Sequence, residues 1–333
     1  VVNSSGCRVG LILAGFDQSI LKNQTLLNVC KNGEIFLIPG GHNADGIEIE
    51  KLKLNKIDKF LKRNLDKIES IAITSQFSTR NPEHENRIKE YIRKKVQLPI
   101  TCSHDLTFNL NGPKRAITCV LNASLANIID RLIIDIEKII LEKDLKSKLM
   151  IVKGDGSLIN PTTARSKPID TTMSGPAAAS VGAVWLTNKK NAIVVDIGGT
   201  TTDISLIKSG FPSISKKGAE IGKWETMVES LSIKTIGLGG DSEVSLPKNN
   251  LFNNLNIGPK RIIPLSLVAK NEPLILKFLL KQSAYPISSE TDGMFVWKKN
   301  LNDSPNWLSK IEKLAYKNLN DKTPIPISEI APN

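Results

Sequence analysis

The stretch A-I-V-V-D-I-G-G-T-T-T-D-I-S-L-I at residues 192–207 restricts the fold more than any other part of the sequence. Two apolar runs, 192–196 and 203–207, are joined by a Gly-Gly turn, which predicts a hairpin and not a strand-to-helix crossover. Carboxylates stand at both strand ends, Asp196 and Asp203, and three threonines follow the glycines. An ordinary glycine hairpin does not need these acids and hydroxyls, so the segment favours binding over a plain turn.

The turn has the residue types that hold a polyphosphate. Glycine accepts a positive φ and lets backbone N–H groups approach phosphate oxygens, and threonine hydroxyls add hydrogen bonds. Asp196 is placed to hold a Mg²⁺-bound water or to orient an attacking oxygen, with Asp203 supporting the hairpin. The sequence contains no Walker A loop, and the strand after the turn argues against a dinucleotide fingerprint. We therefore expect nucleotide phosphates at Gly198, Gly199, Thr200, Thr201 and Thr202.

Composition and charge argue against several other classes of protein. The 333 residues are 40% hydrophobic, enough for one large core or two moderate ones. The net charge of +12 comes from scattered lysines without interleaved aromatic residues, so we expect no nucleic-acid partner. The sequence shows no secretory signal and no apolar run that approaches the roughly eighteen residues of a membrane span. We therefore expect a cytoplasmic protein with no membrane partner.

The four cysteines are widely spaced and form no C-x-x-C pair, which disfavours a zinc knuckle or a redox dithiol. We expect buried thiols at Cys7, Cys30, Cys102 and Cys119.

The apolar periodicity predicts an α/β fold. Strands are expected at 8–14, 70–74, 99–102 and 149–153, and helices at 57–68, 81–96, about 116–143 and 174–186. Beyond about residue 271 the pattern becomes short helices with prolines and a polar end. The long helix at about 116–143 is predicted to be a spine between layers.

An ordered series of short motifs accompanies the hairpin. D-I-G-G-T-T-T-D resembles the second phosphate motif of the actin-like ATPase superfamily, which has a ribonuclease H-like fold. The surroundings resemble the hydantoinase/oxoprolinase family from about residue 8 to 266. The motifs are R-N-P-E-H-E at 80–85, S-H-D at 103–105, N-A-S-L at 122–125, G-D-G-S at 154–157, M-S-G-P-A-A-A at 173–179, T-I-G-L-G-G-D-S at 235–242 and I-G-P-K-R at 257–261.

This resemblance implies an enzyme that uses ATP and Mg²⁺, or another divalent metal, to open a cyclic amide such as a hydantoin or a 5-oxoproline-like lactam. Phosphorylation of the amide oxygen would turn it into a leaving group. The resemblance leaves two alternatives: a subunit of an ATP-dependent ketone carboxylase, or a non-catalytic fragment. It also implies an oligomer and a possible second hydantoinase subunit.

Members of the family begin with another phosphate hairpin and continue beyond the polar C-terminal sequence, so we expect a chain truncated at both ends. The expected domains are the remainder of an N-terminal domain at 1–112, an ATPase domain at 113–270 and an incomplete extension at 271–333. Asp241 stands where many relatives have a third glycine, which suggests a subgroup with a different substrate.

Further residues are candidates for binding, each with an ordinary structural alternative. Gly239, Gly240 and Asp241 would line the sugar or base, or form a surface turn. Ser174 and Gly175 open a helix that would bind an anion, or Ser174 is a simple N-cap. Lys260 and Arg261 would neutralise phosphate, or be a solvated pair.

The three histidines are candidate bases or metal ligands, and capping or another structural role is the alternative for each. His42 lies in G-G-H. His84 with Glu85, and His104 with Asp105, would form one metal or acid/base cluster if the fold brings the two pairs together.

Overall fold

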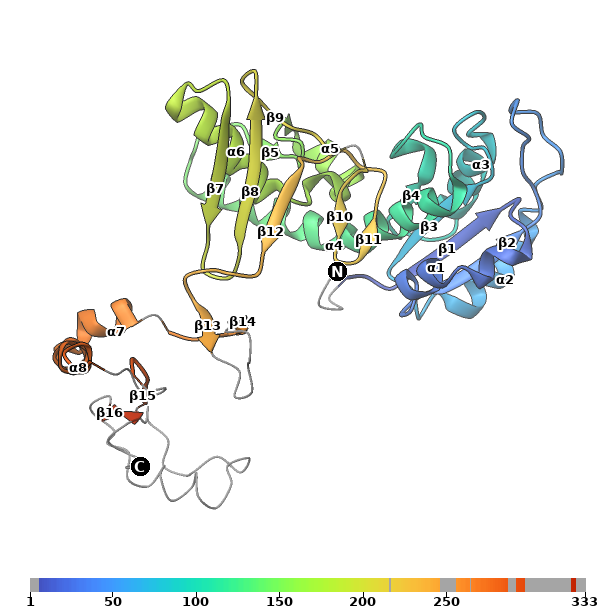
Figure 1. Cartoon of the computed structure of the whole chain (residues 1–333). Coiled ribbons are helices and arrows are strands. Elements are labelled where there is room, and N and C mark those ends of the chain that lie inside the picture. Colours follow the sequence, from blue (N-terminus) through green and yellow to red (C-terminus); the bar gives the residue numbers. More distant parts are fainter. Residues whose placement is uncertain are drawn as a thin grey trace, which may run out of the picture. The chain divides into compact units, whose positions relative to one another are not determined.

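A parallel sheet organises the N-terminal part of the chain (Figure 1). Its strands are β1 (Val9–Ala14), β2 (Glu34–Ile38), β3 (Ser70–Ser75) and β4 (Ile100–Cys102), in the spatial order β2-β1-β3-β4. All three pairings are parallel. In doubly wound sheets with this order, the chain adds strands first on one side of β1 and then on the other, so the strand order changes direction between β1 and β3. Ligands bind at the carboxyl ends of the strands at this point.

Helices cover both faces of this sheet because its strands are apolar on both sides. Leu11 and Leu13 of β1 pack in the cluster that includes α1 (Gln24–Val29) and α4 (Gly112–Glu142). Ile12 and Ala14 pack on the opposite face, with α2 (Asn55–Asn64) and α3 (Glu83–Arg93). Alternate residues of a strand point to opposite faces, so the apolar residues of β1 contribute to the hydrophobic core on each side of the sheet.

Helix α4 has 31 residues and is long and apolar enough to cross a membrane by length and composition. This corrects our expectation that no such run exists. Much of its N-terminal half is buried, and it packs against β1, β3 and β4, as the core helix of a globular protein does. Arg165 of α5 (Pro161–Ser166) ion-pairs with Asp130 and Glu137 on its other half. The helix is thus the spine predicted from its length.

A second sheet follows, in the spatial order β12-β8-β7, with β9 paired to β8. Its strands are β7 (Ala192–Ile197), β8 (Thr202–Lys208), β9 (Phe211–Pro212) and β12 (Ile233–Ile236). The other elements of this region are α6 (Ser174–Thr187) and the pairs β5 (Ile151–Val152) with β6 (Leu158–Ile159) and β10 (Glu220–Ile221) with β11 (Trp224–Glu225). Short 3-10 helices lie at η1 (Gln18–Lys22), η2 (Ser103–Asp105) and η3 (Pro168–Thr171).

The structure is a computed structural model. It describes residues 6–215, 217–245, 256–263, 265–286, 292–296 and 325–327. It divides into two units, residues 1–196 with 203–235, and residues 197–202 with 236–333. The second unit contains the linking turn of the β7–β8 hairpin. Its other elements are β13 (Ser242–Ser245), β14 (Asn256–Arg261), α7 (Leu265–Asn271), α8 (Pro273–Ser283), β15 (Phe295–Val296) and β16 (Ile325–Pro326).

Most predicted elements are present, with shifted ends. The helix expected at 57–68 ends at Asn64, and the strand expected at 149–153 is only Ile151–Val152. Three of the four thiols predicted to be buried are buried and free, Cys30, Cys102 and Cys119, whereas Cys7 is free but only half-buried. Burial raises the pKa of the Cys30 thiol to about 12.

Candidate functional site

The turn between β7 and β8 is open to solvent at its tip. The backbone N–H of Gly198 donates to the carbonyl oxygen of Thr201 at 2.9 Å, which closes the turn. Gly198, Gly199 and Thr200 are exposed, and Thr201 and Thr202 are half-buried. The backbone and hydroxyl groups expected to meet phosphate therefore lie at an accessible surface.

A second glycine turn packs directly on the first. The N–H groups of Gly240 and Asp241 donate to the carbonyl oxygens of Gly198 and Gly199 at 2.9 and 2.8 Å. A Cβ on Gly239 would lie 2.4 Å from the carbonyl carbon of Gly199. Only glycine allows this approach, so the sequence-predicted residues of the two turns form one backbone surface.

Side chains around the second turn fix its position. Thr202 Oγ1 donates to the carbonyl oxygen of Leu238 at 2.6 Å. The guanidinium of Arg261 ion-pairs with the carboxylate of Asp241. Arg261 therefore reaches the paired turns through Asp241, while the side chain of Lys260 lies outside the described residues.

The two acids of the hairpin have different surroundings. Asp196 is exposed near the end of β7. Asp203 is half-buried at the start of β8, where Thr235 Oγ1 donates to its Oδ1 at 2.5 Å. This bond holds β12 beside β8, so Asp203 has a structural contact and Asp196 is free to face solvent.

Ser174 and Gly175 form the first residues of α6. The N-cap position is Met173, in the left-handed region with φ 61°, and the helix has no side-chain cap. Ser174 is therefore not the N-cap, and a Cβ on Gly175 would meet nothing within 4 Å. The start of this helix has the open geometry that an anion site requires.

The histidines fall into two groups, His84 with His42 in one and His104 in the other. His84 Nδ1 accepts from the N–H of Gly41 at 3.0 Å, and its Nε2 lies 2.8 Å from Glu48 Oε1. The ring of His42 lies 4.2 Å from that of His84, centroid to centroid. His42 is fully buried, and both of its ring nitrogens lack a hydrogen-bond partner in the described structure.

His104 belongs to the other group. Its Nδ1 lies 2.6 Å from Glu85 Oε2, and its Nε2 lies 3.3 Å from Asp105 Oδ1. Glu85 and His104, with Cys102, lie close enough together to be considered as metal ligands. However, the buried Glu85 carboxylate also accepts from the N–H groups of Ser75 and His104 and from Ser103 Oγ. These hydrogen bonds satisfy the Glu85 carboxylate without a metal. The ring of His84 is hydrogen-bonded to Glu48 and not to this group.

Arg115 is a charged core residue that the sequence reading did not single out. Its side chain is 1% exposed, and Nη2 donates to the carbonyl oxygen of Ser75 at 2.7 Å and to Ser78 Oγ at 3.2 Å. The feature of the sequence that could have identified it is its position, after Gly112-Pro113 and directly before the apolar run of α4. Burying a cation among apolar residues costs free energy, so an arginine at this position is a candidate functional residue.

The two sheets and the helices that cover them define a mixed α/β protein. Two family models match the chain: the hydantoinase/oxoprolinase N-terminal region over residues 2–96 and hydantoinase/oxoprolinase over residues 115–263. The chain belongs to the hydantoinase/oxoprolinase family.

Characterised relatives match parts of the chain. It is 28% identical over 197 residues to the caprolactamase subunit alpha of Pseudomonas jessenii, covering 58% of this chain and 28% of that subunit. It is 26% identical over 204 residues to the acetophenone carboxylase gamma subunit of Aromatoleum aromaticum, covering 57% and 27%. The matches thus span less than a third of either relative.

The crystal structure of the ATP-dependent caprolactamase from Pseudomonas jessenii has the same fold. It superposes with a TM-score of 0.63 and 23% identity, over 78% of this chain and 40% of that one.

Proposed function

We propose that the chain supplies the ATP-binding part of an enzyme that opens a cyclic amide. The observation that carries the proposal is the pairing of the two glycine turns, in which Gly240 donates to Gly198 and Asp241 to Gly199. Similarity to a caprolactamase subunit supports the substrate class, because a caprolactamase acts on a lactam.

The residues present fit a Mg²⁺-nucleotide. Side chains are excluded where the turns meet: a Cβ on Gly199 would lie 2.9 Å from Asp241 Oδ2, and one on Gly239 would strike Gly199. Backbone amides in such a glycine turn donate to phosphate oxygens without steric hindrance. The carboxylate of Asp196 is exposed and is the type of ligand that Mg²⁺ takes in nucleotide sites.

Each residue then has a defined task. The turn from Gly198 to Thr202 would bind the phosphates through groups other than the Gly198 N–H, which closes the turn, and the Thr202 hydroxyl, which donates to Leu238. Gly239 to Asp241 would support this turn and line the rest of the nucleotide. Asp196 holds the metal or orients the attacking oxygen. Bound ATP supplies the phosphoryl group that makes the amide oxygen a leaving group. Asp203 keeps the hairpin in place through Thr235.

The anion site at Ser174 and Gly175 remains part of the proposal, since the uncapped start of α6 offers N–H groups and the positive end of the helix dipole. For His84 and His104, the contacts favour structural roles over a shared metal site. The domain division near residues 112 and 270, and action in the cytoplasm, also remain proposals.

A second candidate is a subunit of an ATP-dependent ketone carboxylase. This chain is almost as similar to the acetophenone carboxylase subunit, with 26% identity, as it is to the caprolactamase subunit, with 28% identity. Both relatives are named as subunits, which supports a partner subunit for this chain as well.

ADP release by the full-length protein, co-purified with any partner subunit, separates these functions. We expect lactams or hydantoins to stimulate ADP release and ring opening. Release that needs both a ketone and bicarbonate, with consumption of bicarbonate, would instead establish the carboxylase. If no substrate of either class stimulates ADP release, the catalytic assignment is withdrawn.

A further inference from the structure

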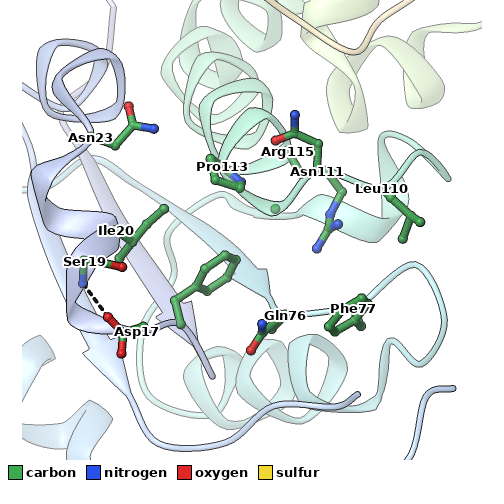
Figure 2. Close-up of a pocket in the computed structure, with 12 residues that line it drawn as sticks. Asp17, Ser19, Ile20, Asn23, Gln76, Phe77, Leu110, Asn111, Pro113 and Arg115 are labelled. Atoms are coloured by element: carbon green, nitrogen blue, oxygen red, sulfur yellow. Dashed lines mark hydrogen bonds between the residues drawn. The ribbon is translucent and has the colours of Figure 1, made fainter. Parts of the chain in front are cut away.

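A pocket of about 500 Å³ opens at the carboxyl ends of β1 and β3 (Figure 2). Phe16 and Asp17 follow β1, and Gln76 and Phe77 follow β3. This is the point at which the order β2-β1-β3-β4 reverses direction, where doubly wound sheets bind their ligands. Its volume is within the range of small-molecule sites. The whole pocket belongs to the first unit and includes no residue of the β7–β8 turn.

Arg115 supplies a buried positive charge to this pocket, and Figure 2 shows its guanidinium pointing from α4 towards Gln76 and Phe77. In the described part of the chain its hydrogen bonds reach only neutral oxygens, those of Ser75, Ser78 and Ser103. None of these bonds comes from Nη1. A buried guanidinium normally has a carboxylate or phosphate partner, because an isolated buried charge is costly.

The charge of Glu85 favours the charged form of Arg115 and so partly offsets its burial, but the two side chains share no direct hydrogen bond in the described part of the chain. Ser103 lies between them: its hydroxyl donates to Glu85 at 2.6 Å and accepts from Arg115 Nε at 3.4 Å. Glu85 is also bonded to His104 and to backbone N–H groups. The Nη1 group of Arg115, which lines the pocket, is therefore left for a further partner.

Two residues of the pocket wall have strained backbones. Phe77 has φ 54° and Asn111, the N-cap of α4, has φ 97°. Non-glycine residues in this region are strained and cluster at binding sites. The strain at Asn111 sets the start of α4, whose dipole adds positive potential beside Arg115.

We propose that this pocket binds a small organic carboxylate, held by Nη1 of Arg115, with its apolar body against Phe16, Ile20 and Phe77. Nη1 is the guanidinium nitrogen that donates no hydrogen bond in the described part of the chain, and a carboxylate oxygen would accept a charge-assisted hydrogen bond from it. Asp17, also in the wall, favours a singly charged anion over phosphate. The Ser19 N–H donates to Asp17 at 2.8 Å and lowers the pKa of that carboxyl, so it stays ionised. The inference rests on the proposed function for its ligand class, a lactam that carries a carboxylate. Binding without nucleotide is measured apart from ADP release, so the failure of one can be told from the failure of the other.

Calorimetric titration of the full-length protein without nucleotide tests the site. The probes are 5-oxoproline, 2-pyrrolidinone, which is the same ring without the carboxylate, and inorganic phosphate. We expect 5-oxoproline to bind at least about tenfold more tightly than either of the others. Ser19 is exposed at the pocket wall, so Ser19→Glu places a repelling charge there without touching the buried network, and Ser19→Gln is the matched control.

We expect Ser19→Glu to weaken 5-oxoproline binding at least about tenfold and Ser19→Gln to change it less than about threefold. Arg115→Lys, checked for folding by circular dichroism, should weaken it too, because one ammonium group cannot keep the contacts with Ser75, Ser78 and Ser103 and also donate to the ligand. Equal binding of the two ring compounds, tighter binding of phosphate, no binding of 5-oxoproline, or equal effects of the two Ser19 variants would each overturn the proposal.

Discussion

The backbone N–H of Gly240 donates to the carbonyl oxygen of Gly198 at 2.9 Å and joins two turns that lie about forty residues apart in the sequence. The packing at this junction gives the first prediction. A methyl group on Gly239 would lie 2.4 Å from Gly199, whereas one on Gly237 would meet nothing within 4 Å. We expect Gly239→Ala to weaken Mg-ATP binding at least about tenfold, since forced overpacking costs about 1–3 kcal/mol.

Gly237→Ala is the matched control and should bind Mg-ATP like the unmodified protein. Isothermal titration calorimetry measures both variants. If the two alanines have the same effect, the close packing of the turns has no bearing on nucleotide binding.

The buried amide of Asn122 connects three segments around α4. Its Nδ2 donates to Thr101 Oγ1 at 2.9 Å and to the carbonyl oxygen of Ser166 at 3.3 Å, and its Oδ1 accepts from the N–H of Ile169 at 3.1 Å. Asn122→Ala leaves these partners unsatisfied, so we expect the free energy of unfolding to fall by about 2–3 kcal/mol.

Urea unfolding measures this loss, with Asn127→Ala, on the same helix, as the control. The control should change stability by less than about 0.5 kcal/mol. A similar small change for Asn122→Ala would show that the three contacts do not stabilise the fold.

The carboxylate of Glu85 gives a third prediction. It is fully buried and accepts from Ser75, Ser103 and His104. Glu85→Gln puts an NH₂ group against these donors and removes the charge, so we expect a loss of about 3 kcal/mol in the free energy of unfolding. Glu83→Gln removes only an exposed ion pair with Arg87 on the same helix and should change the free energy of unfolding by less than about 1 kcal/mol. Equal stabilities of the two variants in urea would contradict the role given to Glu85.

The buried ring of His42 predicts a pH dependence of stability. Burial lowers the pKa of His42, and the neighbouring His84 lowers it further, against smaller opposing effects of Glu83 and Glu48. The folded protein therefore resists protonation of His42 more than the unfolded chain does. The contribution of the neutral His42 ring to the free energy of unfolding is complete above pH 6.5, the pKa of the residue in the unfolded chain. It is lost as the pH falls towards the lower pKa of the folded protein.

His42→Leu should therefore reduce the loss of unfolding free energy between about pH 8 and pH 5. Urea titrations of both proteins across this range measure the difference. Parallel pH profiles would mean that His42 titrates alike in the folded and unfolded chains.

The sequence predicted the hairpin at Asp196–Asp203 because strand, turn and strand are contiguous, and local chemistry defines such a unit. It also predicted most strands and helices of the first sheet from their periodicity. The order of the strands was not predictable, because it depends on pairings between distant segments. The separation of His84 from Glu85 follows from their adjacent positions on α3, which point to different sides of the helix.

Arg115 was missed for a related reason. Its partners, Ser75 and Ser78, are 40 and 37 residues away, and no local pattern identifies an arginine that turns into a pocket. The sheet order and the pocket had to be known before the unbonded Nη1 of Arg115 could be recognised.

We propose that the β7–β8 turn binds Mg-ATP with help from Asp196. Calorimetric titration of the full-length protein with Mg-ATP, for Asp196→Asn and for the exposed control Asp66→Asn, measures this role. We expect Asp66→Asn to bind like the unmodified protein and Asp196→Asn to lose at least about tenfold in affinity or all ATP turnover. Unchanged binding and turnover in Asp196→Asn would show that Asp196 has no part in the site.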